Sequence, residues 1–452
     1  MPNSIRSNIV IYGKGKVGNA VNQLAQSLGL TCKMTDDQDA DFDIKTAQLL
    51  IPSPGIPPRN RAFSGNNTIS ELDFAFRYLP EGFKIITITG TDGKSTTSWI
   101  TYELLRQEFG EEQVFLSGNF EIPFSETVRM IRERGLKRGY IVIEVSSFMA
   151  HGIGDHLPLL DGLPEGHRTG AFFADYTIFT NLETDHVDWH GSVEAYFGAK
   201  MNLVAHTKKR VIAQESLQIK SEKYQLPFPK ITRWYGENQT LKDSTDGENI
   251  RLSGRKKYQL SQTKLTGTFN AMNLLAATCV TNELKICSKR IATYLPTIAG
   301  LPHRLEFVAI KNGVTYIDDS KSTSAQSLKV ALQSYVGKKV VLIAGGSDKG
   351  DSFDHLAPLF TTVVKEVICI GATRELFVEV AKKSGISYSY ADSMKDAVAK
   401  ACQIATLEEV VLLSPGCASF GMFQNYLDRA HQFIAAVQSI PESHDKIRSL
   451  SH

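Results

Sequence analysis

Residues 85–97 read I-I-T-I-T-G-T-D-G-K-S-T-T, so an apolar, β-branched stretch runs directly into a glycine-rich turn. We expect a strand followed by a loop in which two glycines let backbone N–H groups surround a phosphate. Lys94 would add a positive charge, and the Ser95 hydroxyl would be available to Mg²⁺. The loop predicts an ATP site, although Ile88 stands where a complete Walker A motif has its first glycine. The alternative is an ordinary glycine turn at the start of a helix.

The composition limits the rest of the chain to a few classes of protein. At 452 residues the chain exceeds what one hydrophobic core supports, and we expect three domains. Fifty basic against 48 acidic side chains, with no polybasic segment, argue against nucleic acid as a partner. The six cysteines show no metal-binding spacing, and the sequence begins without a signal-peptide pattern. No stretch of about 18 apolar residues occurs, so we expect a cytoplasmic protein without a membrane partner.

Residues 1–84 carry a second glycine-rich pattern. Residues 8–12 predict a strand, and G-K-G-K-V-G at 13–18 places G-x-G-x-x-G between that strand and a helix. Thr35 and Asp36 follow a second predicted strand. Only about 80 residues are available here, which favours a small Rossmann-like domain for a nucleotide diphosphate over an NAD domain.

Residues 85–301 alternate apolar strand patterns with helical patterns, which predicts a parallel sheet covered on both faces. Glu144 ends one buried strand pattern, where it could bind Mg²⁺, cap a helix or form a salt bridge. A second strand pattern is followed by a group of acidic residues and histidines, and we expect at least one member to bind metal or phosphate. The members are Glu183, Asp185, His186, Asp188 and His190.

Two later helix patterns in this region carry polar side chains. Lys200 lies in the middle of the helix predicted at 193–205, and by itself it is interpreted as a surface charge. Asn270 and Asn273 share one face of the helix predicted at 267–277, where their amides could bind an adenine. Because an early helical asparagine usually caps the helix, capping is the favoured local interpretation.

Residues 302–452 predict a third α/β domain. Strand patterns at 314–317, 340–344 and 410–413 each end in a loop rich in glycine, serine or lysine. The carboxyl edge of this sheet should therefore face a ligand. The predicted fold class is α/β with three domains, Rossmann-like at both ends and with a mostly parallel, P-loop-type sheet between them.

Eight short motifs occur in order over nearly the whole chain and together carry a family resemblance. They are T-G-T-D-G-K-S-T, E-V-S-S-F, N-L-E-T-D-H-V-D, Y-F-G-A-K, N-A-M-N, L-P-H-R-L-E, D-D-S-K-S-T and S-P-G-C-A-S-F. The chain resembles the Mur ligases of peptidoglycan synthesis, and among them it is most similar to the D-glutamate-adding members. The D-N-P-R signature of the diamino-acid-adding relatives is missing.

The resemblance implies an ATP- and Mg²⁺-dependent ligase, and we expect a monomer. ATP would phosphorylate the L-alanine carboxylate of UDP-N-acetylmuramoyl-L-alanine, and the amino group of D-glutamate would attack the acyl phosphate to form an amide. Two Mg²⁺ ions would offset the charge of the approaching anions. By the resemblance, Ser95 and Glu144 would hold one ion, and His186 and Lys200 the other, with Lys200 carbamylated.

The same resemblance implies binding roles residue by residue. The catalytic residues would be Lys94, His186 and Lys200. The nucleotide would lie on Gly90, Thr91, Asp92, Gly93, Lys94, Ser95, Thr96, Asn270, Asn273, Arg304 and Asp319. The UDP-linked substrate would lie on Gly13, Gly15, Lys16, Val17, Thr35 and Asp36, with Asn119 near the metal and phosphates. D-glutamate would contact Thr323, Lys349, Ser419 and Tyr426, and His303 would support its neighbour.

Three features depart from the family's pattern. Asp92 stands where asparagine is usual, Met149 replaces a commonly polar residue, and residues 151–170 exceed the usual connection. A negative charge beside ATP phosphates should weaken ATP binding unless a cation offsets it. Three other functions stay open: an amide ligase for a different amino acid, a non-catalytic nucleotide-binding homologue, and a Rossmann dehydrogenase.

Overall fold

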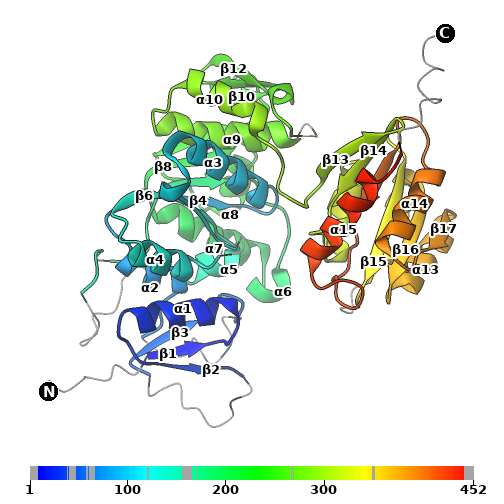
Figure 1. The fold of residues 1–452 in the computed structure, drawn as a ribbon. Coiled ribbons are helices and arrows are strands. Elements are labelled where there is room, and N and C mark those ends of the chain that lie inside the picture. Colours follow the sequence, from blue (N-terminus) through cyan, green and yellow to red (C-terminus); the bar gives the residue numbers. More distant parts are fainter. Residues whose placement is uncertain are drawn as a thin grey trace. The chain divides into compact units, whose positions relative to one another are not determined.

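The structure is a computed structural model of the chain, and it divides into two compact units at residues 298 and 299 (Figure 1). The described residues are 9–37, 39, 47–57, 60, 67–119, 122–154, 165–168, 170–265, 267, 269–348 and 352–441, without the side chains of Asp188 and Gln326. The predicted domain limits, 84/85 and 301/302, stay predictions.

The N-terminal part of the first unit is a parallel sheet in the order β2-β1-β3. Its elements are β1 (Ile9–Tyr12), α1 (Lys16–Ser27), β2 (Cys32–Thr35) and β3 (Leu49–Pro52), and α2 (Glu71–Tyr78) leads towards the central sheet. Every residue of β1 and β3 is buried, because the helices and the rest of the unit cover these strands. The strand and helix predicted around G-K-G-K-V-G are therefore present.

The centre of the first unit is a six-stranded sheet, parallel throughout, in the order β5-β6-β4-β7-β8-β9. Its strands are β4 (Gly82–Thr89), β5 (Val114–Gly118), β6 (Arg138–Glu144), β7 (Ala174–Phe179), β8 (Thr207–Gln214) and β9 (Thr232–Tyr235). The helices are α3 (Lys94–Phe109), α4 (Phe124–Glu133), α5 (Ser147–His151), α6 (Val187–His190), α7 (Val193–Ala205) and α8 (Leu217–Tyr224). The predicted parallel central sheet is confirmed.

A small antiparallel sheet and two helices complete the first unit. They are β10 (Ser244–Thr245), β11 (Asn249–Leu252), β12 (Arg255–Gln259), α9 (Phe269–Glu283) and α10 (Ser288–Tyr294). Among the described residues of the chain, short 3₁₀ helices cover Glu111–Gln113, Leu260–Gln262, Leu295–Thr297 and Asp354–Leu356. Helix α9 packs along α3, the helix that follows the glycine-rich loop.

The two largest apolar clusters of the first unit lie on opposite faces of the central sheet. One joins the N-terminal sheet to the central sheet through buried side chains such as Ile11, Leu72 and Val128. Helix α1 lies between the N-terminal sheet and helices α2 and α4, as Figure 1 shows. The other cluster lies on the opposite face of the central sheet, where α3 and α9 bury residues such as Leu104 and Leu274. Burial of this apolar surface stabilises both interfaces.

The second unit is a six-stranded sheet in the order β13-β14-β18-β15-β16-β17, with only β13 antiparallel. Its strands are β13 (Glu306–Lys311), β14 (Val314–Asp318), β15 (Val340–Gly346), β16 (Val364–Gly371), β17 (Ser387–Tyr390) and β18 (Val410–Leu413). The helices are α11 (Ala325–Gln333), α12 (Ala357–Val363), α13 (Arg374–Ser384), α14 (Met394–Ile404) and α15 (Tyr426–Gln438). Helices α11 to α13 contribute to one apolar cluster and helices α14 and α15 to another, one on each face of the sheet.

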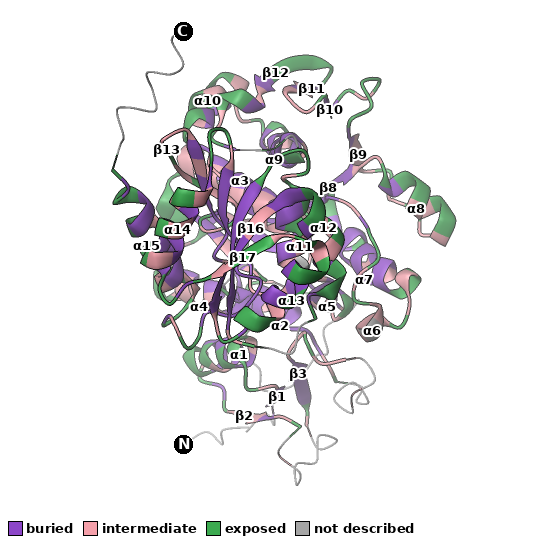
Figure 2. Cartoon of the chain, turned by 90° about the vertical axis from the view of Figure 1, so that its right-hand side faces the viewer, coloured by how far each residue is buried: buried purple, intermediate pink, exposed green. Residues whose placement is uncertain are grey.

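Burial follows this layered arrangement. The inner strands of both large sheets are buried, whereas the outer face of a helix such as α8 is exposed (Figure 2). Within the described residues, no helix is both long enough and apolar enough to pass through a bilayer. The chain thus has the predicted α/β architecture of three sheet-based domains, with two domains in the first unit and one in the second.

Candidate active site

The glycine-rich loop lies between the carboxyl end of β4 and the first turn of α3, as the sequence predicts. Gly90 and Gly93 have φ angles of 147° and 77°, which side chains rarely allow. A Cβ atom on Gly90 would lie 1.9 Å from Thr180 Oγ1, and one on Gly93 would lie 2.7 Å from Asn273 Oδ1. Glycine is therefore required at both positions, because a side chain would clash with its neighbours and would strain the backbone.

Two polar residues after β7 fix the shape of this loop. Thr180 Oγ1 donates to the Asp92 carbonyl at 2.6 Å. Asn181 Oδ1 accepts from the backbone N–H groups of Thr91 and Asp92, at 3.2 Å and 2.8 Å. Sequence analysis did not assign roles to Thr180 and Asn181, although both follow a predicted strand at the ligand-binding edge. They hold the loop in place through backbone groups.

The first turn of α3 provides the groups expected to meet phosphate. Lys94 begins the helix, and its Nζ donates to the Thr91 carbonyl at 2.6 Å, so the side chain folds back over the loop. Ser95 and Thr96 are partly exposed in the same turn. Backbone N–H groups in a first helical turn have no partner within the helix, and the helix dipole favours an anion there. The geometry suits a phosphate group.

Glu144 ends β6 next to the loop strand and has one unused oxygen. The residue pairs with Ile88 in the sheet register, and its side chain is only 2% exposed. Oε1 accepts from Asn119 Nδ2 at 2.8 Å, whereas Oε2 is buried without a hydrogen-bond partner among the described residues. A buried carboxylate oxygen in this position is costly unless a cation meets it. Of the roles left open for Glu144, this geometry fits a cation ligand better than a cap or a salt bridge.

Lys200 lies inside the protein, so its local interpretation as a surface charge is wrong. The residue is 1% exposed, and its Nζ donates to the Gly90 carbonyl at 2.7 Å and to Thr89 Oγ1 at 3.5 Å. Nζ also lies 4.7 Å from the centre of the Tyr196 ring. Burial, and then the charge of Lys94, hold the Lys200 pKa well below its usual value. The uncharged amine is correspondingly favoured.

The histidine and acidic group after β7 separates into different environments. His186 is the N-cap of α6 with a left-handed φ of 49°, is about half exposed, and lies 3.4 Å from Asp185 between Nε2 and Oδ2. Its ring is 6.1 Å from that of Tyr196, the same ring that lies under Lys200. His190 instead interacts with Ser147 Oγ at 3.0 Å. The His190 ring is also near that of Tyr196, at 5.4 Å, and Tyr196 contacts Thr91 Oγ1 at 3.1 Å. Both histidines therefore lie close to the tyrosine that contacts Lys200 and the loop.

Asn270 and Asn273 are buried on α9 where it packs against α3. Asn273 Oδ1 accepts from Thr97 Oγ1 at 3.1 Å, and its Nδ2 donates to Asn270 Oδ1 at 2.9 Å. The Asn273 side chain therefore joins two helices under the glycine-rich loop, and the capping interpretation is wrong for it. The Asn273 amide thus lies directly behind Gly93, and Asn270 is hydrogen-bonded to it.

The N-terminal glycine pattern forms a tight turn. Gly13 has φ 113°, and its N–H donates to the Thr35 carbonyl at 2.7 Å. A Cβ on Gly18 would lie 1.9 Å from the Gly13 carbonyl oxygen. Gly15 caps α1, and Lys16 and Val17 form the first turn of that helix. Lys14 is paired with Asp36 and Asp39, so this lysine is not simply exposed to solvent.

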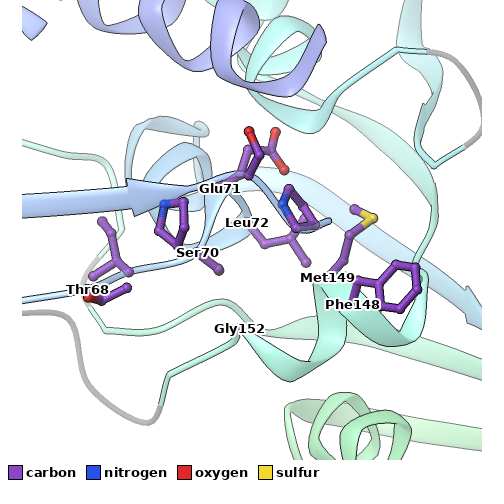
Figure 3. A pocket seen from close by; sticks show the side chains of 11 residues that line it. Thr68, Ser70, Glu71, Leu72, Phe148, Met149 and Gly152 are labelled. Carbon is purple, nitrogen blue, oxygen red and sulfur yellow. The ribbon is translucent and has the colours of Figure 1, made fainter. Parts of the chain in front are cut away.

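A mostly apolar cavity lies where the N-terminal sheet meets the central one (Figure 3). Its lining includes Thr68, Ser70 and Leu72 on one side and Phe148, Met149 and Gly152 of the α5 region on the other. Trp189 joins the same two parts, since its Nε1 donates to the Gly55 carbonyl at 3.2 Å. Met149, one of the departures noted above, therefore lies at this junction, and most of the 151–170 segment is outside the described residues.

In the second unit, the expected nucleotide and amino-acid residues follow β14 and β18. Asp319 is buried, and it accepts from Ser414 Oγ at 2.7 Å and from the Leu305 N–H at 3.2 Å. Burial raises the pKa of Asp319 to about 7. His303 Nδ1 lies 2.8 Å from Asp318 Oδ2, which raises the His303 pKa and anchors the segment before the exposed Arg304.

The residues expected to meet D-glutamate are only partly covered by the described structure. Thr323 is half-buried, Ser419 is buried, and Tyr426 begins α15. All three lie at or beyond the carboxyl edge formed by the adjacent parallel strands β14 and β18. Lys349 lies outside the described residues. Arg429, which had no predicted role, is fully buried on α15 and bonds to the Cys417 and Ser320 carbonyls.

Known protein families and relatives match most of the chain. A model of the Mur ligase middle domain matches residues 88–281, and one of the Mur ligase, glutamate ligase domain matches residues 303–417. The UDP-N-acetylmuramoylalanine–D-glutamate ligase of Aquifex aeolicus is 31% identical over 439 residues, which cover 95% of this chain and 98% of that protein. The enzyme of the same name from Lactobacillus acidophilus is 28% identical over 469 residues, covering 96% and 97%.

A solved structure matches the fold of the whole chain. The MurF ligase of Thermotoga maritima in complex with ADP aligns with a TM-score of 0.54, covers 100% of both chains, and is 16% identical in sequence. This likeness concerns the fold alone.

Proposed function

Because the chain belongs to the Mur ligase family, we propose that it joins D-glutamate to UDP-N-acetylmuramoyl-L-alanine and converts ATP to ADP and phosphate. The name of the D-glutamate-adding relatives, which align over nearly the whole chain, supports this choice of substrates. The observation that carries the proposal is the unpartnered, buried Oε2 of Glu144 beside a glycine-rich loop. In this assignment, residues 1–84 bind the UDP part, residues 85–301 bind ATP, and residues 302–452 bind the amino acid.

The reaction needs two consecutive transfers. First, an oxygen of the L-alanine carboxylate attacks the γ-phosphorus of ATP, ADP leaves, and an acyl phosphate forms. Then the uncharged amino group of D-glutamate attacks the acyl carbon, the C–O bond to phosphate breaks, and an amide forms with loss of one proton. Lys94 and the N–H groups of the loop would bind the phosphates and place them in line for the first transfer.

The groups around the loop fit Mg²⁺ in different ways. Ser95 and Glu144 offer the hydroxyl and carboxylate oxygens that Mg²⁺ prefers, and the unpartnered Oε2 supports a cation there. When bound, Mg²⁺ would neutralise the negative charge that builds up as two anions meet. His186 and Lys200 both lie near the Tyr196 ring, and these two residues would hold the second ion.

Lys200 fits the second ion only after a change in its chemistry, because an amine is a poor ligand for Mg²⁺. We propose that its uncharged Nζ attacks the carbon of CO₂, forms an N–C bond and loses one proton, which gives an anionic carbamate. The depressed Lys200 pKa supplies the uncharged amine that this addition requires. The hydrogen bond to the Gly90 carbonyl would place the new carboxyl group beside the phosphate loop.

The test is a release assay for ADP and phosphate with Mg²⁺, UDP-N-acetylmuramoyl-L-alanine and a panel of amino acids. We expect ADP formation only when the UDP-linked substrate and D-glutamate are both present. Turnover with a different amino acid would keep the ligase chemistry and replace the proposed substrate. No ADP with any amino acid would contradict the proposal and favour a binding protein, and oxidation of NADH would favour a dehydrogenase.

Substitution Lys94→Ala tests the role of Lys94 in the same assay. Loss of the charge nearest the expected phosphates should abolish measurable turnover while the protein remains folded. The matched control is Lys289→Ala, because Lys289 is exposed on α10, away from the loop. A Lys94→Ala variant with a near-normal rate would contradict the role assigned to Lys94.

A further inference from the structure

Helix α15 holds a buried guanidinium group whose bonds all lead to neighbouring loops. The Arg429 side chain is 0% exposed. Its Nη1 donates to the Cys417 carbonyl at 3.0 Å, and its Nη2 donates to the Ser320 carbonyl at 2.7 Å. Nε is buried without a hydrogen-bond partner among the described residues. Burying a positive charge costs free energy, so the two hydrogen bonds of Arg429 require an explanation beyond the packing of apolar side chains.

The two carbonyls belong to two different segments at one edge of the sheet. Ser320 lies just after β14 and Cys417 just after β18, and these strands are adjacent and parallel, with Asp318 opposite Leu413. Both segments therefore leave the sheet in the same direction. Thr323 lies three positions beyond Ser320, and Ser419 lies two positions beyond Cys417.

Closer to the sheet, the same segments are tied by other bonds. The Asp319 N–H donates to the Leu413 carbonyl at 2.7 Å, and Ser414 Oγ donates to Asp319 Oδ2 at 2.7 Å. These contacts fix the strand ends but not the residues farther along each segment. Arg429 binds both segments farther from the strand ends, close in sequence to Thr323 and Ser419.

We propose that Arg429 is a positioning residue for the amino-acid substrate: its two N–H donors set the spacing between the segment that carries Thr323 and the segment that carries Ser419. This inference rests on the proposed function, which places the amino acid on those segments. Arginine suits the task because its planar fork presents donors at fixed angles, whereas lysine is a single flexible point charge. Its positive charge also faces the adjacent Asp318 and Asp319 carboxylates.

The first test is Arg429→Lys, which keeps the charge and can replace only part of the fork. We expect KM for D-glutamate to rise about tenfold, since roughly one buried hydrogen bond is lost from the geometry of that site. KM for ATP and for the UDP-linked substrate should stay within about twofold, because only the segments tied by Arg429 move apart. The matched control is Arg374→Lys, an exposed arginine of the same unit paired with Asp392.

A chemical rescue separates positioning from a general structural role. Arg429→Ala should show a larger rise in KM for D-glutamate than Arg429→Lys, and millimolar guanidinium chloride should reverse part of that rise. A rescue that acts on this one KM would not follow from improved folding alone. Equal changes in all three KM values, or an unchanged KM for D-glutamate in Arg429→Lys, would overturn the proposal.

A measurement on the unaltered protein keeps the proposal testable if both variants fail to fold. The Nη1 and Nη2 protons of Arg429 should exchange slowly with solvent before any amino acid is added, because both groups are buried and bonded to the Cys417 and Ser320 carbonyls. Fast exchange of these side-chain protons in the free protein would overturn the inference. If the amino-acid panel selects a substrate other than D-glutamate, the same KM comparison is made with that substrate, so failure of the proposed function and failure of the Arg429 role remain distinguishable.

Discussion

Lys200 and Arg429 are two buried basic side chains, each near the carboxyl ends of parallel strands, and they differ in what burial does to them. They are 1% and 0% exposed. Burial holds the Lys200 pKa well below its usual value, whereas it lowers the pKa of Arg429 only to about 10. Lys200 can therefore lose its proton and react, but Arg429 stays charged near neutral pH and can only bind and position. We therefore assign a reactive role to the buried lysine and a positioning role to the buried arginine.

Within this comparison, the largest effect should come from Lys200→Ala, and a small effect would contradict the reactive role given to Lys200. Loss of the amine beside the Gly90 carbonyl should lower kcat by at least about 100-fold, a barrier increase of about 2.7 kcal/mol. If the reactive form is a carbamate, added acetate should restore part of the rate by supplying a carboxylate in the vacated space. The matched control is Lys209→Ala, because Lys209 is more exposed and pairs with Asp175.

The same comparison extends to a buried carboxyl group for which the described residues provide no ion pair. Glu71 on α2 is 2% exposed and accepts from the Ser125 N–H at 2.5 Å. Burial raises the pKa of Glu71 to about 7, above its unfolded value. Between that unfolded value and pH 7 the folded state binds the extra proton, so the free energy of unfolding falls as pH rises through this window.

Substitution Glu71→Gln should remove that pH-dependent penalty and keep an oxygen for Ser125. At pH 8 we expect the variant to be more stable than the unaltered protein by roughly 2 kcal/mol, and at pH 4 to be nearly equal to it. Urea unfolding at the two pH values measures the difference. The exposed Glu237→Gln is the control. An equal change at both pH values would mean that burial does not shift the titration of Glu71.

Substitution Glu144→Gln tests whether the surroundings of Lys200 bind a cation. Glutamine keeps the shape and the Asn119 contact but removes the negative charge behind the unpartnered oxygen. We expect the Mg²⁺ concentration for half-maximal activity to rise about tenfold, with partial recovery in excess Mg²⁺. The control Glu126→Gln changes a carboxylate that pairs with Arg129 on α4. An unchanged Mg²⁺ dependence would remove Glu144 from the metal site.

Local sequence could predict the loop but not the buried groups that surround it. Within residues 85–97, the β-branched run and the glycines determine strand, turn and helix through short-range sterics. Lys200 meets Gly90, which is 110 positions away in sequence, and no periodicity within its own helix indicates that contact. Arg429 and Ser320 are 109 positions apart. Such side chains are placed by sheet order, which a single sequence leaves undetermined without the family resemblance.

The smallest expected effect concerns Asp92, an exposed charge on the same loop that Lys200 contacts. Its backbone groups fix the loop through Asn181 and Thr180, so Asp92→Asn should leave the loop's shape intact. Removing the exposed charge should lower KM for ATP only about two- to threefold and leave kcat unchanged, because water and salt screen it. The difference should shrink as ionic strength rises in an ATP titration. A tenfold or salt-independent change would show that exposure does not weaken a charge at this site, and the contrast between buried and exposed groups would no longer hold.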